Sequence, residues 1–213
     1  LNRFSQALES LEKALALKPD FADAHNNRGI VLQELGRFDA SLSSYDQALK
    51  LKPDFAEAVF NRGRVLTELR RFDEAINHYD RALALRPGYP DARFNKSIAL
   101  LREGFFEAAW SLHESRWDVK HAGFKKRECA APLWLGREPL DGKSILLRTE
   151  QGMGDNIQFC RYAKLLHEQG ARVLLETPKP LMSLLAGLAG VDELVEIGTA
   201  PAAIDYHCPL LSL

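Results

Sequence analysis

The sequence has few of the residues from which disulfide frameworks and metal sites are built. It contains three cysteines and six histidines among 213 residues, and both types are widely scattered. An odd, dispersed set of cysteines argues against a disulfide framework, and also against a zinc site, which needs ligands at short and defined spacings. We therefore expect reduced cysteines, as in a cytoplasmic protein, and no metal or other cofactor.

Long hydrophobic runs and an excess of charge of one sign are also lacking. No uninterrupted apolar stretch approaches the roughly 18–20 residues that span a bilayer, and the first ten residues lack the apolar core of a signal peptide. The 28 basic and 29 acidic residues give a formal net charge of −1. A chain this close to neutral has no strong field for nucleic acid or for an anionic membrane, so we expect neither as a partner.

The first half of the sequence does contain an internal period of 34 residues, which is typical of repeat architectures. Proline, asparagine, phenylalanine, alanine and leucine each return at this step. The recurring positions are Pro19, Pro53 and Pro87; Asn27, Asn61 and Asn95; Phe4, Phe38, Phe72 and Phe106; Ala14, Ala48 and Ala82; and Leu32, Leu66 and Leu100. A register held at so many positions predicts a stack of similar units.

The order of residues within one period resembles the tetratricopeptide repeat. The pattern is Gly29-x-x-Leu32-x-x-x-Gly36-x-Phe38, then Tyr45-x-x-Ala48-Leu49, then Pro53. The resemblance covers about residues 1–117 and implies an α-solenoid of antiparallel helical hairpins. One hairpin is expected at about 21–35 and 38–51, with Gly36 at positive φ in its turn, whereas residues 1–17 supply only a second helix. Gly29 and Gly63 should permit close approach of neighbouring helices.

Three asparagines, Asn27, Asn61 and Asn95, share one position on successive first helices. Asparagine is a mediocre helix former, so its recurrence needs a reason. An amide carries both a donor and an acceptor, and a row of amides in the concave groove can bind the backbone of an extended peptide. In this respect the repeats resemble the superhelix of the nucleocytoplasmic O-GlcNAc transferase, which has a row of asparagines on its inner face. The alternative, which stays open, is that these amides bond across repeats and only stabilise the stack.

Two further features of the repeats bear on binding and packing. Arg64, three residues after Asn61, is a candidate charged contact for a peptide, and no repeated set of Lys or Arg positions that would clamp a terminal carboxylate stands out. The last repeat departs from the pattern at Trp110 and Trp117. We expect both tryptophans to bury area against the segment that follows.

Beyond the repeats the pattern changes twice. Residues 118–143 lose the period and contain several prolines and glycines, which predicts a packed connector. Residues 144–213 then alternate apolar strands with amphipathic helices, which predicts a partial α/β domain with a parallel, Rossmann-like sheet. The expected strands are 144–149, 171–176, 193–197 and 203–208, and the expected helices are 155–169 and 179–188.

A glycine-containing loop, Gly152-Met153-Gly154, follows the first of these strands. A dinucleotide fingerprint would need a third glycine, but that position holds Ile157. Glu176 does end the second strand, where a ribose-binding acid would lie. Asp155, however, would repel a phosphate next to the loop, so a phosphate cradle is disfavoured.

Asp155 itself has two interpretations. It can cap the following helix, with Gln158 completing a capping box. It also lies at the carboxyl end of a strand, where open α/β sheets bind ligands, and a carboxylate held there can act as a general base.

The segment of about residues 110–213 resembles the amino-terminal domain of heptosyltransferase-like glycosyltransferases, through the Gly152-x-Gly154-Asp155 loop and its flanking strands. With the repeats included, the chain more closely resembles bacterial proteins that fuse tetratricopeptide repeats to such a domain. The resemblance implies a loop of Gln151, Gly152 and Gly154 that presents Asp155 as the candidate catalytic base. It also implies a second α/β domain for the sugar nucleotide, so we expect no activity from this chain alone.

Two functions of different classes follow from these patterns. The first is a protein-interaction module that binds an extended peptide or partner protein in the concave groove and carries an incomplete glycosyltransferase-like lobe. The second is a fragment of a protein glycosyltransferase in which the repeats select the acceptor and Asp155 is the base. The chain begins inside a repeat, so the exposed end of the solenoid is a candidate surface for self-association.

Overall fold

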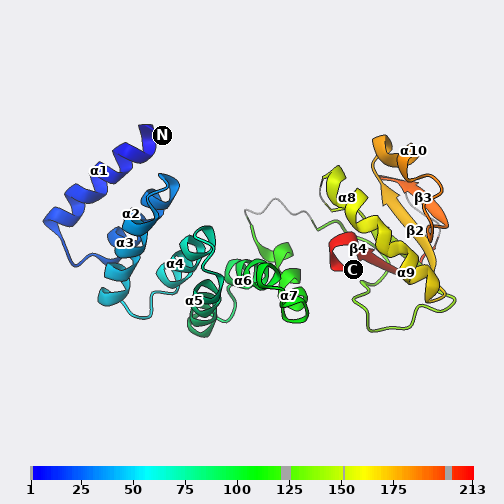
Figure 1. The fold of residues 1–213 in the computed structure, drawn as a ribbon, viewed down its shortest axis with the longest axis horizontal. Helices are drawn as coiled ribbons and strands as arrows, with labels where there is room; N and C mark the ends of the chain where they lie inside the picture. Colours follow the sequence, from blue (N-terminus) through cyan, green and yellow to red (C-terminus); the bar gives the residue numbers. More distant parts are fainter. Residues whose placement is uncertain (1, 121–125, 151, 200–202) are drawn as a thin grey trace. The chain divides into compact units, whose positions relative to one another are not determined.

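The computed structural model describes residues 2–120, 126–150, 152–199 and 203–213 (Figure 1). The chain forms two compact units, Leu1–Ala122 and Gly123–Leu213. Gln151, one of the predicted loop residues, lies outside the described residues. No helix within the described ranges is long and apolar enough to cross a membrane.

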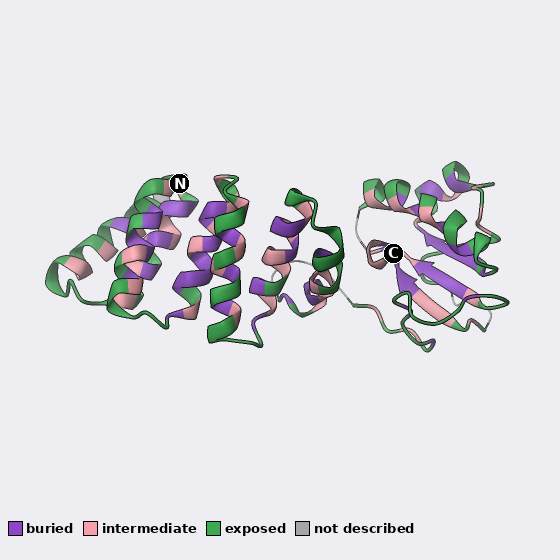
Figure 2. Ribbon diagram, turned by 60° about the horizontal axis from the view of Figure 1, so that its bottom comes forward, coloured by how far each residue is buried: buried purple, intermediate pink, exposed green. Residues whose placement is uncertain are grey.

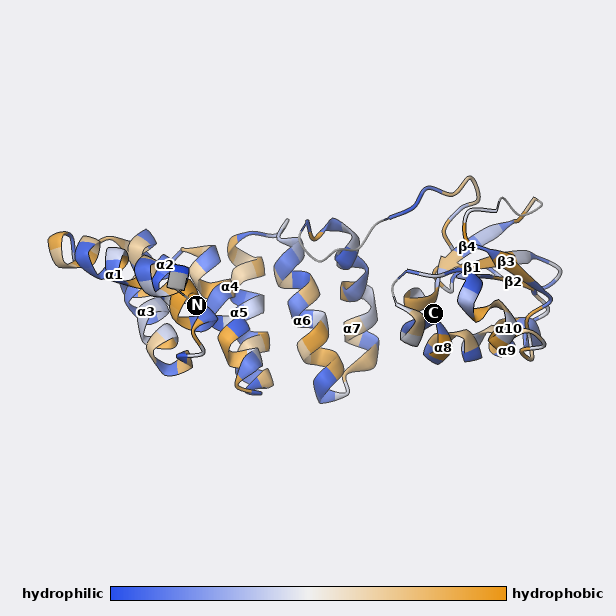
Figure 3. Ribbon diagram, turned by 90° about the horizontal axis from the view of Figure 1, so that it is seen from above, coloured by the Kyte–Doolittle hydropathy of each residue, from blue (hydrophilic) through white to orange (hydrophobic). Residues whose placement is uncertain are grey.

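The first unit is a solenoid of antiparallel helical hairpins, as the 34-residue period predicts. Its helices are α1 (Asn2–Leu17), α2 (Ala22–Glu34), α3 (Phe38–Leu51), α4 (Ala56–Glu68), α5 (Phe72–Leu85), α6 (Pro90–Glu103) and α7 (Phe106–His113), followed by the 3-10 turn η1 (Glu114–Asp118). The expected hairpin differs from α2 by one residue at each end and coincides with α3. In Figure 3 hydrophilic and hydrophobic residues alternate around α4 to α7, as amphipathic helices require.

In the hairpins α2–α3 and α4–α5, a glycine of the first helix faces a tyrosine of the second. A Cβ atom on Gly29 would lie 2.5 Å from the ring of Tyr45, and one on Gly63 would lie 2.8 Å from the ring of Tyr79. Both tyrosines are fully buried. The predicted close approach at these two glycines is confirmed, and the aromatic ring that fills the space comes from the same hairpin.

The solenoid core runs continuously between hairpins, so that the buried faces of α3 to α6 meet along the stack (Figure 2). Its centre contains Tyr45, Val59, Leu66 and Tyr79, none of which retains accessible surface. The last repeat differs from the prediction. Trp110 is 46% exposed, and its ring meets the edge of His113 at 6.0 Å, so the expected burial of this tryptophan is wrong.

The second unit is a four-stranded sheet with the order β3-β2-β1-β4, in which every neighbouring pair is parallel. The strands are β1 (Ser144–Arg148), β2 (Arg172–Thr177), β3 (Glu193–Glu196) and β4 (Tyr206–Pro209). Helices α8 (Met153–Phe159), α9 (Ala163–Glu168) and α10 (Met182–Leu185) lie on one side of it (Figure 3). The main core of this unit forms between those helices and the sheet.

The connector joins this sheet through backbone pairing. Trp134 N donates to the carbonyl of His207 at 2.9 Å, and His207 N donates to the carbonyl of Pro132 at 3.0 Å. The ring of Trp134 is buried and its Nε1 donates to the carbonyl of Glu138 at 2.8 Å. Leu135, in contrast, remains 45% exposed, so only one of these two neighbouring apolar residues docks on the sheet.

The helices of this unit are shorter than predicted. The expected helix at 155–169 starts earlier, at Met153, and a 3-10 turn, η2 (Cys160–Tyr162), separates α8 from α9. Gly152 is the N-cap, no side chain caps the helix, and Asp155 lies within the first turn. The capping box of Asp155 and Gln158 is therefore wrong. The expected helix at 179–188 is only the turn η3 (Lys179–Leu181) and α10.

Candidate functional site: the inner face of the repeats and the Asp155 loop

The first helices of the hairpins form the inner side of the solenoid. Helix α2 contacts α4, and α4 contacts α6, more closely than successive second helices approach one another. Each first helix presents a line of residues at steps of four, three and four, which share one helical face. This inner strip consists of Asp23, Asn27, Ile30 and Glu34; Glu57, Asn61, Arg64 and Glu68; and Asp91, Asn95, Ile98 and Arg102.

The three predicted asparagines of the inner strip lie in different environments. Asn27 is exposed, and Asn95 is half-buried and donates from Nδ2 to the carbonyl of Asp91 at 2.8 Å. Asn61 is only 7% exposed, and its Nδ2 donates to Oδ1 of Asn26 at 3.1 Å, across the boundary between repeats. Phe60 occupies the position of Asn26 in the next repeat, so Asn95 has no such amide to bind. The role of these asparagines as peptide ligands stays a prediction.

Arg64, the predicted charged contact, lies half-buried among three buried tyrosines. Burial raises the pKa of Tyr45, Tyr79 and Tyr89 to about 12, and the positive charge of Arg64 acts in the opposite direction on all three. The guanidinium therefore lies within electrostatic range of all three phenol groups. Its role in peptide binding stays a prediction.

The inner strip carries a net negative charge. It holds five carboxylates against two guanidinium groups. Glu57 pairs with Arg86 at 3.5 Å. Within the described ranges Asp23, Glu34 and Glu68 are exposed and have no ion-pair or hydrogen-bond partner. Unpaired carboxylates that share one surface attract cationic groups.

A second set of charged residues recurs at 34 residues and was missed at the sequence level. Arg28, Arg62 and Lys96 each pair with a carboxylate sixteen residues earlier, on the preceding second helix. The pairs are Arg28–Glu12 at 3.8 Å, Arg62–Asp46 at 2.8 Å and Lys96–Asp80. These repeated cations join neighbouring hairpins, so they are not the carboxylate clamp whose absence the sequence predicted. The same period that revealed the asparagines could have revealed them.

In the second unit, Gly152, Gly154 and Asp155 begin α8 directly after β1. The carboxylate of Asp155 is half-buried. Glu150, on the other side of the loop, accepts a hydrogen bond from the backbone N of Leu211 at 3.1 Å, and Leu211 follows β4. The loop thus lies at the carboxyl ends of β1 and β4. The sheet continues from β1 to β2 and β3 on one side and to β4 on the other, so the strand order reverses at this point.

Glu176, which lies where a ribose-binding acid would be expected, is already paired. Its side chain is 6% exposed, its Oε1 accepts from Nη1 of Arg127 at 3.0 Å, and Arg148 approaches within 3.9 Å. Arg127 also donates to the carbonyl of Thr149 at 2.6 Å. The carboxylate thus fastens the connector to the ends of β1 and β2. Within the described ranges no group of three potential ligands could hold a metal ion.

Comparison with known proteins extends this description. A tetratricopeptide repeat model matches residues 27–90 and 61–117, and a second one matches residues 1–36. The crystal structure of MamA is 23% identical over 54% of this chain and 67% of that chain, with a TM-score of 0.51. MamA from Desulfovibrio magneticus RS-1 is 20% identical over 55% of this chain and 66% of that chain, also at 0.51.

At these identities the likeness to solved structures shows the fold alone. No curated protein matches the chain significantly. The two repeat models together cover residues 1–117, which is more than half of the chain. The chain therefore belongs, through these residues, to the tetratricopeptide repeat family.

Proposed function

We propose that the inner strip binds an extended segment of a partner protein that carries basic side chains. The observation that supports this most directly is the set of exposed, unpaired carboxylates Glu34 and Glu68 beside the exposed amide of Asn27 on the first helices. Amides bind a peptide backbone without reading its sequence, and carboxylates select for Lys and Arg. The chain is thus a protein-interaction module whose preference is set mainly by charge.

The asparagines and the glutamates of the inner strip have different roles in the proposed complex. Asn27 and Asn95 contact the peptide backbone, whereas Asn61 holds α2 and α4 in register through Asn26. Glu34 and Glu68 pair with basic side chains on either side of Arg64. Each hydrogen bond contributes about 0.5–1.5 kcal/mol, so a few such contacts give modest affinity that rises at low salt.

Binding of fluorescent Lys- and Arg-containing peptides to paired variants tests this proposal. Asn27→Ala with Asn95→Ala should weaken binding about fivefold to tenfold and leave helicity unchanged. Glu34→Gln with Glu68→Gln should weaken the binding of basic peptides and reduce the dependence of their affinity on salt concentration. Asp73→Asn, which removes a carboxylate from the second helix α5, is the matched control. Equal binding by all of these variants would reject the inner strip as the site.

A second candidate function rests on the position of Asp155. The strand order β3-β2-β1-β4 with parallel neighbours is that of the start of the Rossmann order, and open α/β sheets of that order bind ligands at the point where the order reverses. This supports a glycosyltransferase-like lobe in which the repeats deliver an acceptor and Asp155 takes the proton of its hydroxyl. In the longest natural form of the protein, Asp155→Asn should keep the fold and lower glycosyl transfer about 10²-fold or more. Normal transfer by that variant would exclude the catalytic role.

A further inference from the structure

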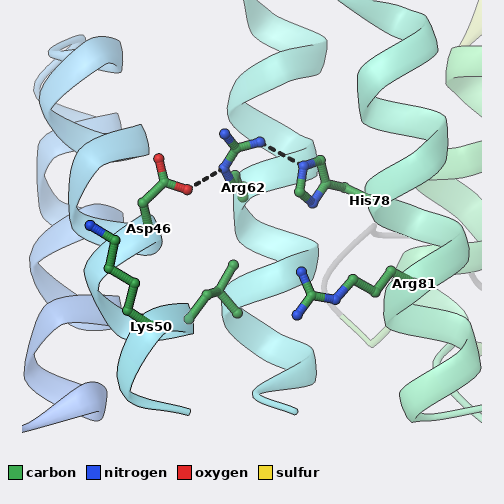
Figure 4. A pocket seen from close by; sticks show the side chains of 6 residues that line it. Asp46, Lys50, Arg62, His78 and Arg81 are labelled. Carbon is green, nitrogen blue, oxygen red and sulfur yellow. Dashed lines mark hydrogen bonds and ion pairs between the residues drawn. The ribbon is translucent and has the colours of Figure 1, made fainter. Parts of the chain in front are cut away.

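An open recess lies between the second helices α3 and α5, with α4 behind it (Figure 4). Its volume is about 420 Å³, which accommodates a small ion and its hydration water. The lining residues are Asp46, Leu49 and Lys50 of α3, Arg62 of α4, and His78 and Arg81 of α5. The recess thus gathers three cationic side chains around one carboxylate and one imidazole.

Only part of this positive charge is used inside the protein. Arg62 donates from Nε to Asp46 at 2.8 Å and from Nη1 to Nε2 of His78 at 2.6 Å, which leaves Nη2 available. Arg81 donates from Nη2 to the carbonyl of Pro53 at 2.6 Å. Lys50 is exposed and has no ion-pair or hydrogen-bond partner among the residues that the structure describes. Figure 4 shows Lys50 and Arg81 on opposite sides of the recess.

The repeat architecture does not account for these additional cations. One period before and after, the position of Lys50 holds Ala16 and Ala84, and that of Arg81 holds Gln47 and Ser115. The ion pairs Arg28–Glu12 and Lys96–Asp80 form at the neighbouring boundaries, although no cation equivalent to Lys50 or Arg81 is present there. Stacking of hairpins therefore needs one cation and one carboxylate at each boundary. Of the three described boundaries, only the middle one has two further cations, Lys50 and Arg81, where the other two have uncharged residues.

We propose that this recess binds the phosphate group of a ligand, held by Lys50, Arg62 and Arg81. A phosphate oxyanion accepts charge-assisted hydrogen bonds from several donors at once, and arginine presents its N–H groups in a fork that matches phosphate geometry. The three cations come from three helices, so they surround an ion rather than line a flat surface. None of the residues that line the recess belongs to the inner strip, so the proposal does not depend on peptide binding there.

The imidazole of His78 can report the binding of an anion in the recess. Burial, followed by the positive charges of Arg62 and Arg81, lowers its pKa to about 4, whereas Asp46 and Glu74 act in the opposite direction. The imidazole is neutral at pH 7 and accepts the hydrogen bond from Arg62. A bound dianion would offset the two guanidinium charges, and the pKa of His78 would rise.

The test is an NMR titration of the full chain with sodium phosphate at constant ionic strength. The imidazole signal of His78 is assigned by its loss in His78→Asn. We expect a saturable shift of that signal and a higher pKa of His78 in the phosphate-saturated protein. O-phosphoserine should produce the same shift, because it presents a phosphate monoester, whereas acetate should shift the signal little.

Variants separate a site from general attraction of ions. Lys50→Gln should raise the dissociation constant for phosphate about threefold or more. The change breaks no ion pair or hydrogen bond of Lys50 with the described residues. Arg3→Gln removes an equal charge from α1, outside both the recess and the inner strip, and should leave the constant unchanged. A linear, unsaturated shift, an equal response to acetate, or equal effects of both variants would overturn the proposal. None of these outcomes bears on peptide binding by the inner strip.

Discussion

Arg70 occupies a backbone conformation that the neighbouring repeats give to glycine. Its φ is 59°, and Gly36 and Gly104, one period before and after it, have φ of 70° and 83°. A side chain in this left-handed region costs about 1–2 kcal/mol, and the greater freedom of glycine in the unfolded chain offsets part of that. Arg70→Gly should therefore stabilise the first unit by about 0.5–1 kcal/mol in urea denaturation. Gly36→Arg should destabilise it, and stabilisation by both changes would contradict the argument.

Gly29 and Gly63 are required for a different reason, which is space. A Cβ on Gly29 would enter the ring of Tyr45, whose fully buried position leaves little room to move. Gly29→Ala should destabilise the repeats by about 1–3 kcal/mol through overpacking. Gly88→Ala is the control, since nothing lies within 4 Å of a Cβ there, and it should change the thermal midpoint little. Similar losses for both variants would mean that the alanine Cβ at position 29 is accommodated.

At the scale of helices and strands, element boundaries were predicted accurately where the 34-residue period applies and less accurately where it does not. Helices α2 and α3 were placed within one residue, because several positions per repeat fix the same boundaries. Between 155 and 169 only amphipathicity was available, and it does not show where a helix tightens into η2. One of the two interpretations of Asp155, the helix cap, depended on residue type alone, whereas Gly152 takes the extended conformation of the N-cap. The pairing of Asn61 depends on Asn26, a position that does not recur.

The contact between α4 and α5 predicts a dependence of stability on pH. The unfolded chain protonates His78 near its ordinary pKa of 6.5, whereas the folded protein does so only near 4. Between these values the unfolded state binds more protons, so the free energy of unfolding falls as pH falls from 6.5 to 4. The loss should be about 1 kcal/mol, allowing for solvent around a half-buried ring. In urea denaturation across this pH range, His78→Asn should lose less unfolding free energy than the parent chain. Equal losses in the two proteins would contradict the role of His78.

At the scale of the molecule, the two units should be separable. The core of the repeats is built from residues of α3 to α6 and their neighbours, and the core around the sheet is built from residues after 130. A fragment of residues 1–120 therefore retains its apolar contacts, and its energetics are those of a stack of hairpins that contact their neighbours. We expect it to unfold cooperatively, with a thermal midpoint within a few degrees of the repeat transition in the full chain.

The same fragment should keep both functions proposed for the repeats. It contains the complete inner strip and the recess formed by α3, α4 and α5, so basic peptides and inorganic phosphate should bind it about as well as they bind the full chain. Calorimetry with each probe, on both proteins at matched salt, measures this directly. A cooperative fragment that lost peptide binding but kept phosphate binding would mean that the second unit supplies part of the peptide site. Loss of cooperative unfolding would instead show that the repeats need the second unit to fold.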